Sequence, residues 1–240
     1  GSERVMVSEI AGTTRNPVDV LVTRGGKSYV LVDTAGIRRK GKTTDSAELL
    51  SVVAARKAME RARVAIIIFD AKEGITSQDA HIAGYAEEAR RGLILVANKW
   101  DLIEDDPVAQ KTLRDDVRRR FIFTRGAAFL TVSAKTGLGI EKLLPEADAV
   151  ARRLATKLPT GELNRMLKKA FEAQLPKGKS GRELKIRYAV QIASDPPLVR
   201  LFSDRDEPLH FSFERFLQNR LREQWDLAGV PLKFVVRKGE

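Results

Sequence analysis

The chain has 240 residues, 43% of them apolar and 31% charged, which is typical of a globular protein with one or two domains. It has no cysteine, which excludes disulfides and thiolate metal sites, and no apolar run approaches the roughly 18 residues of a membrane helix. The net charge of +11 favours a polyanionic partner such as RNA, although a merely basic surface is the alternative. Because no export signal is visible at the N-terminus, we expect a cytoplasmic protein.

The first part of the chain alternates between strand and helix patterns. Two β-rich runs, 18–23 and 28–33, flank Gly25-Gly26 and predict a hairpin. Beyond a polar loop we expect, in order, helix 48–63, strand 64–70, helix 77–91, strand 92–98, helix 111–121, strand 129–133 and helix 140–158. The strands 64–70 and 92–98 are apolar on both faces, which indicates a parallel sheet covered by helices.

A second, smaller domain is predicted after a linker at 158–161. Its pattern is helix 163–175, strand 184–192, strand 198–202, helix 211–227 and strand 232–236. The predicted organisation is therefore an α/β domain at 1–158 and a small α+β domain at 159–240. The second domain has 16 Lys and Arg against 11 Asp and Glu, so it has a net charge of +5.

Four short motifs occur in a fixed order along the α/β domain. They are Gly12-Thr13-Thr14, Asp33-Thr34-Ala35-Gly36, Asn98-Lys99-Trp100-Asp101 and Ser133-Ala134-Lys135. This is the order of the guanine-nucleotide motifs of a GTPase, although each motif alone also fits an ordinary turn or helix cap.

The last two motifs predict contacts with a guanine base. The carboxylate of Asp101 can accept hydrogen bonds from guanine N1–H and N2–H, which adenine does not offer. We expect Asn98 to brace neighbouring loops, the stem of Lys99 to lie along the base, and backbone N–H groups of residues 133–135 to meet guanine O6.

The first two motifs predict contacts with Mg²⁺ and phosphate. Asp33 can hold Mg²⁺ through water, the N–H of Gly36 can contact the γ-phosphate, and a hydroxyl of Thr13 or Thr14 can join the metal. Ile37 follows where many GTPases have a glutamine that orients water. An apolar side chain cannot do this, so the sequence assigns no catalytic residue.

Taken together, the motifs and their surroundings resemble the Der (EngA) family of bacterial ribosome-assembly GTPases. The resemblance covers nearly the whole chain and includes residues 10–15, 30–41, 97–101, 185–191 and 215–223. That family has two consecutive GTPase domains and a C-terminal KH-like domain, and this chain resembles the second GTPase domain and the KH-like domain.

The resemblance implies a fold, an activity and partners. The expected fold is a P-loop-GTPase-type, mostly parallel sheet followed by a KH-like domain. The implied activity is hydrolysis of GTP to GDP and phosphate, with Mg²⁺ and K⁺ as cofactors. The implied partners are the large ribosomal subunit and its rRNA, in the cytoplasm, and neither membrane nor DNA. The nucleotide-binding residues carried over are Asp33, Thr34, Ala35, Gly36, Ile37, Asn98, Lys99, Trp100, Asp101, Ser133, Ala134 and Lys135, and the metal-binding residues are Thr13, Thr14 and Asp33.

No Gly-rich phosphate loop precedes Thr13, so we expect the chain alone to bind GTP weakly. The alternative function is an rRNA- or ribosome-binding module without hydrolysis. Gly36–Thr43 fits the pattern G-x-x-x-x-G-K-[ST], with Asp70 as the partner that holds Mg²⁺, but it overlaps the Asp33 motif and its helix begins late. Gly178–Gly181 resembles the GXXG loop of KH domains but precedes a strand, so it predicts a basic turn.

Overall fold

The structure is a computed structural model that describes residues 6–9, 19–32, 56–121 and 126–239. The internal contacts divide the chain into two compact units, Gly1–Arg63 and Val64–Glu240. The predicted boundary between residues 158 and 159 lies within the second unit and stays a prediction. In the described parts of the chain, no helix is both long and apolar enough to cross a lipid bilayer.

The first unit contains an antiparallel sheet with the strand order β1-β2-β3. Its strands are β1 (Met6–Glu9), β2 (Val20–Arg24) and β3 (Lys27–Leu31). The predicted hairpin is confirmed: Gly25 and Gly26 have φ of 57° and 74°, as the two-residue turn between twisted strands requires. The sequence did not predict β1, since four residues carry too little pattern. Of the helix predicted at 48–63, residues 56–63 are described, and the helix ends at residue 61.

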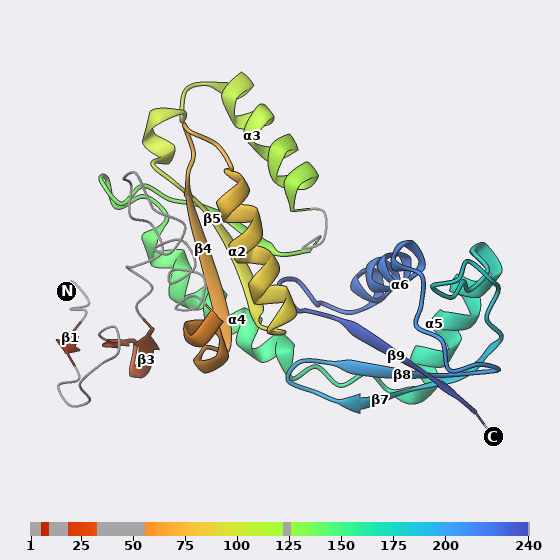
Figure 1. Cartoon of the computed structure of the whole chain (residues 1–240). Helices are drawn as coiled ribbons and strands as arrows, with labels where there is room; N and C mark the ends of the chain where they lie inside the picture. Colours follow the sequence, from red (N-terminus) through yellow and green to blue (C-terminus); the bar gives the residue numbers. More distant parts are fainter. Residues whose placement is uncertain (1–5, 10–18, 33–55, 122–125, 240) are drawn as a thin grey trace, which may run out of the picture. The chain divides into compact units, whose positions relative to one another are not determined.

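The second unit begins with a parallel sheet in the order β4-β5-β6, which confirms the predicted α/β fold. Its strands are β4 (Val64–Asp70), β5 (Gly92–Asn98) and β6 (Ala128–Thr131), and its helices are α2 (Ser77–Glu88), α3 (Pro107–Arg120) and α4 (Leu143–Leu154). Residues 92–97 of β5 are all buried, as the continuous apolar run predicts. On one face of the sheet, Ile94 and Val96 pack with Val150 of α4. Figure 1 shows α2 and α4 beside the central strands.

The bounds predicted for all three helices of this sheet were wrong. Helix α2 ends at Glu88, three residues before its predicted end. Helix α3 begins four residues earlier than predicted, because the carboxylate of Asp106 accepts hydrogen bonds from the N–H groups of Val108 and Ala109. The predicted closing helix 140–158 is divided into a 3-10 turn, η3 (Ile140–Lys142), and α4, which ends at Leu154. The parallel packing of the strands is unaffected by these shifts.

The remainder of the second unit has the predicted order of elements. It consists of α5 (Thr160–Ala173), β7 (Ile186–Ala193), β8 (Leu198–Ser203), α6 (Phe211–Gln224) and β9 (Lys233–Lys238). Strand β8 lies between β7, to which it is antiparallel, and β9, to which it is parallel. Both helices cover one face of this sheet, and the shared core includes Leu163, Leu167, Val199, Leu201 and Leu217. This is the predicted KH-like α+β fold.

The predicted basic turn at residues 178–181 is confirmed. The N–H of Gly181 donates to the carbonyl oxygen of Gly178 at 2.9 Å, and the flanking residues Lys177 and Glu183 form an antiparallel bridge. The N–H of Ser180 donates to the carboxylate of Glu207 at 2.6 Å. The segment is therefore a turn between extended backbone and not a loop that joins two helices.

Candidate nucleotide-binding site

The candidate site lies at the carboxyl ends of the parallel strands, where ligands bind in open α/β sheets. Strand β5 ends at Asn98, and Lys99 then adopts the left-handed conformation with φ of 62°. This sharp change of direction begins a short 3-10 helix, η1 (Trp100–Leu102). Trp100 is buried, and its N–H donates to the carbonyl oxygen of Val132 beyond β6 at 3.0 Å. The loops after β5 and β6 are thus joined.

Asn98 is the centre of this junction. Its Oδ1 accepts from the N–H of Lys99 at 2.8 Å and from the N–H of Ala134 at 3.0 Å. Its backbone carbonyl accepts from the N–H of Ala71, beyond β4, at 2.8 Å. One residue therefore connects the chain segments that follow three neighbouring strands, which holds the loops at fixed positions.

Asp101 is oriented by Ser133. Ser133 is fully buried, and its Oγ donates to Oδ1 of Asp101 at 2.5 Å while accepting from the N–H of Thr136 at 3.1 Å. A hydroxyl can donate once and accept from others, so both contacts are satisfied together. Asp101 is half-buried, and within the described residues its Oδ2 has no hydrogen-bond donor. The arrangement leaves a carboxylate oxygen of fixed direction for an outside donor.

Lys99 makes an ion pair that the sequence did not predict. Its Nζ lies 2.6 Å from Oδ2 of Asp70 at the end of β4, while Oδ1 of Asp70 accepts from the N–H groups of Lys72 and Glu73 at 2.8 and 3.2 Å. Burial raises the pKa of Asp70, but the hydrogen bonds from Lys99 and the two backbone groups outweigh it and leave that pKa below its usual value. Asp70 is therefore an ionised anchor for Lys99.

This pairing bears on the alternative in which Gly36–Thr43 is a phosphate loop. In that interpretation Asp70 is a ligand of Mg²⁺. In the structure, however, both carboxylate oxygens of Asp70 accept hydrogen bonds from protein groups. Residues 36–43 themselves lie outside the described residues.

One backbone donor of the fourth motif, Ser133-Ala134-Lys135, is already engaged within the protein. The N–H of Ala134 donates to Asn98, so in this structure it does not point freely toward a base. The N–H of Lys135 has no acceptor among the described residues, and its side chain is exposed. The turn is closed by Gly139, whose φ is 72° and where a Cβ would collide with the carbonyl oxygen of Thr131. Lys135 is therefore the better candidate donor in this loop.

The remaining predicted site residues are outside the described part of the chain. They are Thr13, Thr14, Asp33, Thr34, Ala35, Gly36 and Ile37. Among the residues that the structure describes, no group of three or more histidine, cysteine or acidic side chains is arranged to hold a metal ion. Sequence reasoning missed the role of Asp70 as the partner of Lys99, although its position directly after a buried strand is the signal that marks such residues.

Two family models match the chain. Residues 1–99 match a model described as a 50S ribosome-binding GTPase, and residues 157–237 match a model described as the C-terminal KH-domain-like region of EngA bacterial GTPase enzymes. The first matched region ends at Lys99, within the third motif, and the second contains α5, β7, β8, α6 and all but the last residue of β9.

The chain is similar over its whole length to curated proteins named GTPase Der. It is 42% identical to that of Desulforudis audaxviator over 240 residues, which are the whole chain and 55% of the relative. It is 44% identical to that of Geobacillus thermodenitrificans over 237 residues, which are 99% of the chain and 54% of the relative. The chain thus spans about half the length of the relatives it matches.

Two solved structures of Era also match the chain. One is Aquifex aeolicus Era bound to GDP·AlF4⁻, with a TM-score of 0.41, 18% identity, and coverage of 98% of this chain and 80% of Era. Another is Era in complex with MgGDPNP and nucleotides 1506–1542 of 16S ribosomal RNA. Its TM-score is 0.44 at 20% identity, and the match covers 95% of this chain and 83% of Era. Both TM-scores are below 0.5, and no functional conclusion follows from them.

Proposed function

Because the chain belongs to the Der (EngA) family of GTPases, we propose that residues 98–101 and 133–135 form the guanine-binding corner of a GTP site. We further propose that the GTPase of which this corner is part hydrolyses GTP and acts in assembly of the large ribosomal subunit. The observation that carries the first proposal is the carboxylate of Asp101, held by Ser133 with one oxygen left for an outside donor.

The chemistry of the corner distinguishes guanine from adenine. The free carboxylate oxygen of Asp101 accepts from guanine N1–H and N2–H, and adenine presents an acceptor at N1 and no amino group at C2. Each such hydrogen bond to a charged group contributes about 1.5–3 kcal/mol. The N–H of Lys135 donates to O6 of guanine, where adenine has an amino group that would repel it. Asn98 does not need to touch the base, because it holds the two loops in place.

The phosphate end of the site is proposed from sequence alone. Thr13, Thr14 and Asp33 would hold Mg²⁺, which neutralises charge on the phosphates, and the segment Thr34–Ile37 would contact the γ-phosphate. K⁺ is proposed as a further cofactor because the resemblance to the Der family implies it, in place of the glutamine that Ile37 replaces. All these residues lie outside the described part of the chain.

The ribosomal partner is supported by charge and by the relatives. The region 159–240 carries a net charge of +5, and rRNA is the polyanion that a ribosome-assembly protein meets. The family model at residues 1–99 is described as ribosome-binding. We therefore propose rRNA of the large subunit as the partner, in the cytoplasm.

Guanine selectivity is tested by nucleotide titration of the 240-residue chain, followed by NMR of its N–H groups. We expect millimolar GDP and GTP to shift the Trp100 indole and the Lys135 amide, and ADP to shift neither. Asp101→Asn should transfer the response to xanthosine nucleotides, since xanthine accepts at the position where guanine donates. The matched control is Asp105→Asn, an exposed carboxylate four residues away. Equal responses to GDP and ADP would remove Asp101 from the base pocket.

The same titration tests whether Gly36–Thr43 is a phosphate loop. We expect the chain by itself to bind GTP weakly, because backbone N–H groups and a lysine of a phosphate loop are worth about 6 kcal/mol in total, or roughly four decades of affinity. Lys42→Ala should leave this weak binding unchanged. Micromolar affinity that is lost in Lys42→Ala would instead make Gly36–Thr43 the phosphate loop.

A further inference from the structure

The sheet β7–β8–β9 has one face covered by helices and one face that no described element covers. The core face carries Ala189, Val199, Leu201, Phe234 and Val236, all buried against α5 and α6. Because successive side chains of a strand alternate in direction, the residues between these point to the opposite face. We refer to that side as the open face.

The open face carries aromatic and cationic side chains in adjacent rows. Strand pairing places Tyr188, Phe202 and Arg237 side by side across the three strands, and places Arg200 in the next row with Val190 and Val235. A third row contains Leu198 and Lys233. The open face thus has two aromatic rings and three cations, of which Arg237 is paired with the carboxylate of Asp206 at 3.1 Å. The paired residues of β7–β9 themselves include no acidic residue.

The two aromatic rings form a platform of a defined size. The ring centroids of Tyr188 and Phe202 lie 6.0 Å apart with an interplanar angle of 35°. The side chain of Tyr188 is exposed, with a relative exposure of 46% for the residue, and Phe202 is half-buried beside it. Tyrosine has an apolar ring face and a polar tip and is enriched at interfaces, so the platform is a surface suited to stacking.

Arg200 is the second independent feature. It is half-buried in the middle of the open face, and among the described residues it has no ion-pair or hydrogen-bond partner, with its Nε buried and unsatisfied. Its neighbours in the row, Val190 and Val235, offer no acceptor. A cation held in a fixed place without an internal counter-charge is available for an anion from outside.

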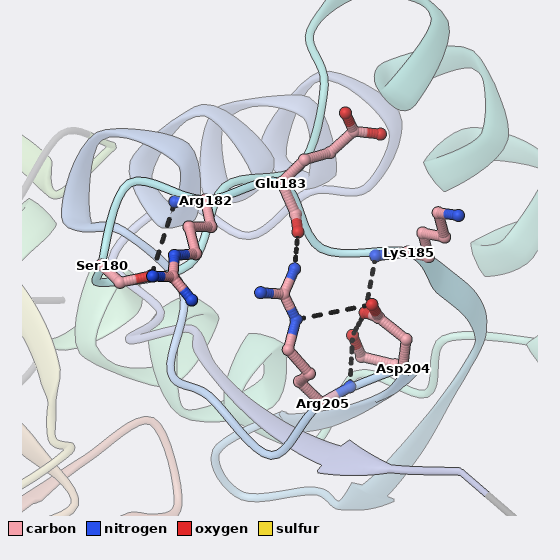
Figure 2. A network of polar contacts seen from close by, with 7 residues as sticks. Ser180, Arg182, Glu183, Lys185, Asp204 and Arg205 are labelled. Atoms are coloured by element: carbon pink, nitrogen blue, oxygen red, sulfur yellow. Dashed lines mark hydrogen bonds and ion pairs between the residues drawn. The ribbon is translucent and has the colours of Figure 1, made fainter.

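A polar network holds the end of the sheet beside this platform. Oδ1 of Asp204 accepts from the N–H of Lys185 at 2.9 Å and from Oγ of Ser203 at 3.0 Å, while Arg205 donates to the carbonyl oxygen of Glu183 (Figure 2). The hydrogen bond to the Lys185 N–H lowers the pKa of Asp204, so the carboxylate remains ionised. The segment before β7 and the loop after β8 are thereby tied together, and the binding surface is formed before a ligand arrives.

The same network fixes a basic segment at this end of the sheet. Residues 177–185 include four exposed cations, Lys177, Lys179, Arg182 and Lys185, and Glu207 holds the turn through the N–H of Ser180. Phosphates of a chain that leaves the platform would meet these cations. Proteins that bind single-stranded nucleic acid commonly combine aromatic side chains, on which bases stack, with a positively charged surface that contacts the phosphates.

From these observations we propose that the open face binds single-stranded RNA. Two bases stack on Tyr188 and Phe202, and Arg200, which has no ion-pair partner among the described residues, contacts an adjoining phosphate. The surface lies on the side of the sheet opposite α5 and α6, and the turn Gly178–Gly181 does not clamp the backbone as a GXXG loop does. The proposal takes from the proposed function only that the polyanion is RNA.

The test is fluorescence anisotropy of the 240-residue chain with a labelled 12-nucleotide single-stranded RNA. Alanine substitution of a stacking ring removes about 1–3 kcal/mol per base, so Tyr188→Ala should weaken binding by about 5- to 150-fold. Tyr188→Phe retains the ring and should bind as the parent chain does. Phe211→Ala removes a ring with 67% exposure at the start of α6 and should have no effect.

A second variant keeps the proposal testable if the first perturbs the fold. Arg200→Met removes a cation that has no internal partner, so it should leave the unfolding midpoint unchanged, weaken binding and reduce the salt slope by about 1. The matched control is the pair Lys168→Met and Lys169→Met, two exposed cations on α5 that line a groove with Arg220 on the helical side. A fully paired RNA duplex of the same length should bind less tightly, because its bases are not free to stack.

Two results would overturn the proposal. If Tyr188→Ala and Arg200→Met bind RNA as the parent chain does while the Lys168/Lys169 pair weakens binding, RNA lies on the helical side and the ribosomal partner stands. If no RNA binds at low salt, the open face and the rRNA partner are both contradicted, while the guanine-binding corner is judged by its own titration.

Discussion

The hydrogen bond between Ser133 and Asp101 allows a quantitative test of the candidate site. Ser133→Ala removes a donor to a half-buried carboxylate and an acceptor for the N–H of Thr136. Hydrogen bonds to charged groups contribute about 1.5–3 kcal/mol and neutral ones about 0.5–1.5 kcal/mol. Ser133 is fully buried, so water cannot replace the hydroxyl without rearrangement. We expect the free energy of unfolding to fall by about 2–4 kcal/mol.

The assay is urea denaturation followed by tryptophan fluorescence, since Trp100 is buried in the same corner. Ser77→Ala, an exposed serine in the first turn of α2, is the control and should change stability by less than about 0.5 kcal/mol. A double-mutant cycle with Asp101→Asn should give a coupling energy above about 1 kcal/mol between Ser133 and Asp101. A loss in Ser133→Ala no larger than in Ser77→Ala, or a coupling energy near zero, would refute the reasoning.

Two further predictions concern stability. Burial raises the pKa of Glu87 to about 7 although Arg222 lowers it, so the folded state holds a proton that the unfolded state releases above about pH 4.5. Stability should therefore decline between about pH 4.5 and 7, by about 1–2 kcal/mol after allowance for partial exposure, and Glu87→Gln should abolish this part of the decline in urea titrations at several pH values. Gly229→Ala should destabilise the chain by about 1–3 kcal/mol, because φ is 74° and the new Cβ would lie 2.8 Å from the carbonyl oxygen of Leu93. Thermal unfolding compares it with Gly84→Ala in α2, which meets no atom within 4 Å and should stabilise by about 0.5–1 kcal/mol.

Much of the candidate site follows from local patterns in the sequence. The apolar run 92–98 predicts a buried strand, and a parallel βαβ arrangement brings the carboxyl ends of neighbouring strands to one edge. That rule alone places Asn98, Asp101 and Ser133 near one another. In the structure the two loops are joined by hydrogen bonds from Ser133 to Asp101 and from Ala134 to Asn98. The hairpin at Gly25-Gly26 is determined in the same way, because only a few residue types adopt positive φ at both positions.

Other features depend on which side chains meet after the chain has folded. The ion pair between Lys99 and Asp70 joins residues 29 positions apart in the sequence. The N–H of Ala134, which the motif suggested was free to bind a base, instead donates to Asn98. The sequence also does not predict that Arg200 has no partner among the described residues. Alternation of side chains along a strand predicts two faces but not which of them the helices cover. The periodicity of apolar residues predicts the conformation of a segment. Ion pairs, the hydrogen-bond partners of backbone N–H groups and the exposure of a sheet face depend on contacts between segments, and only the tertiary structure determines these contacts.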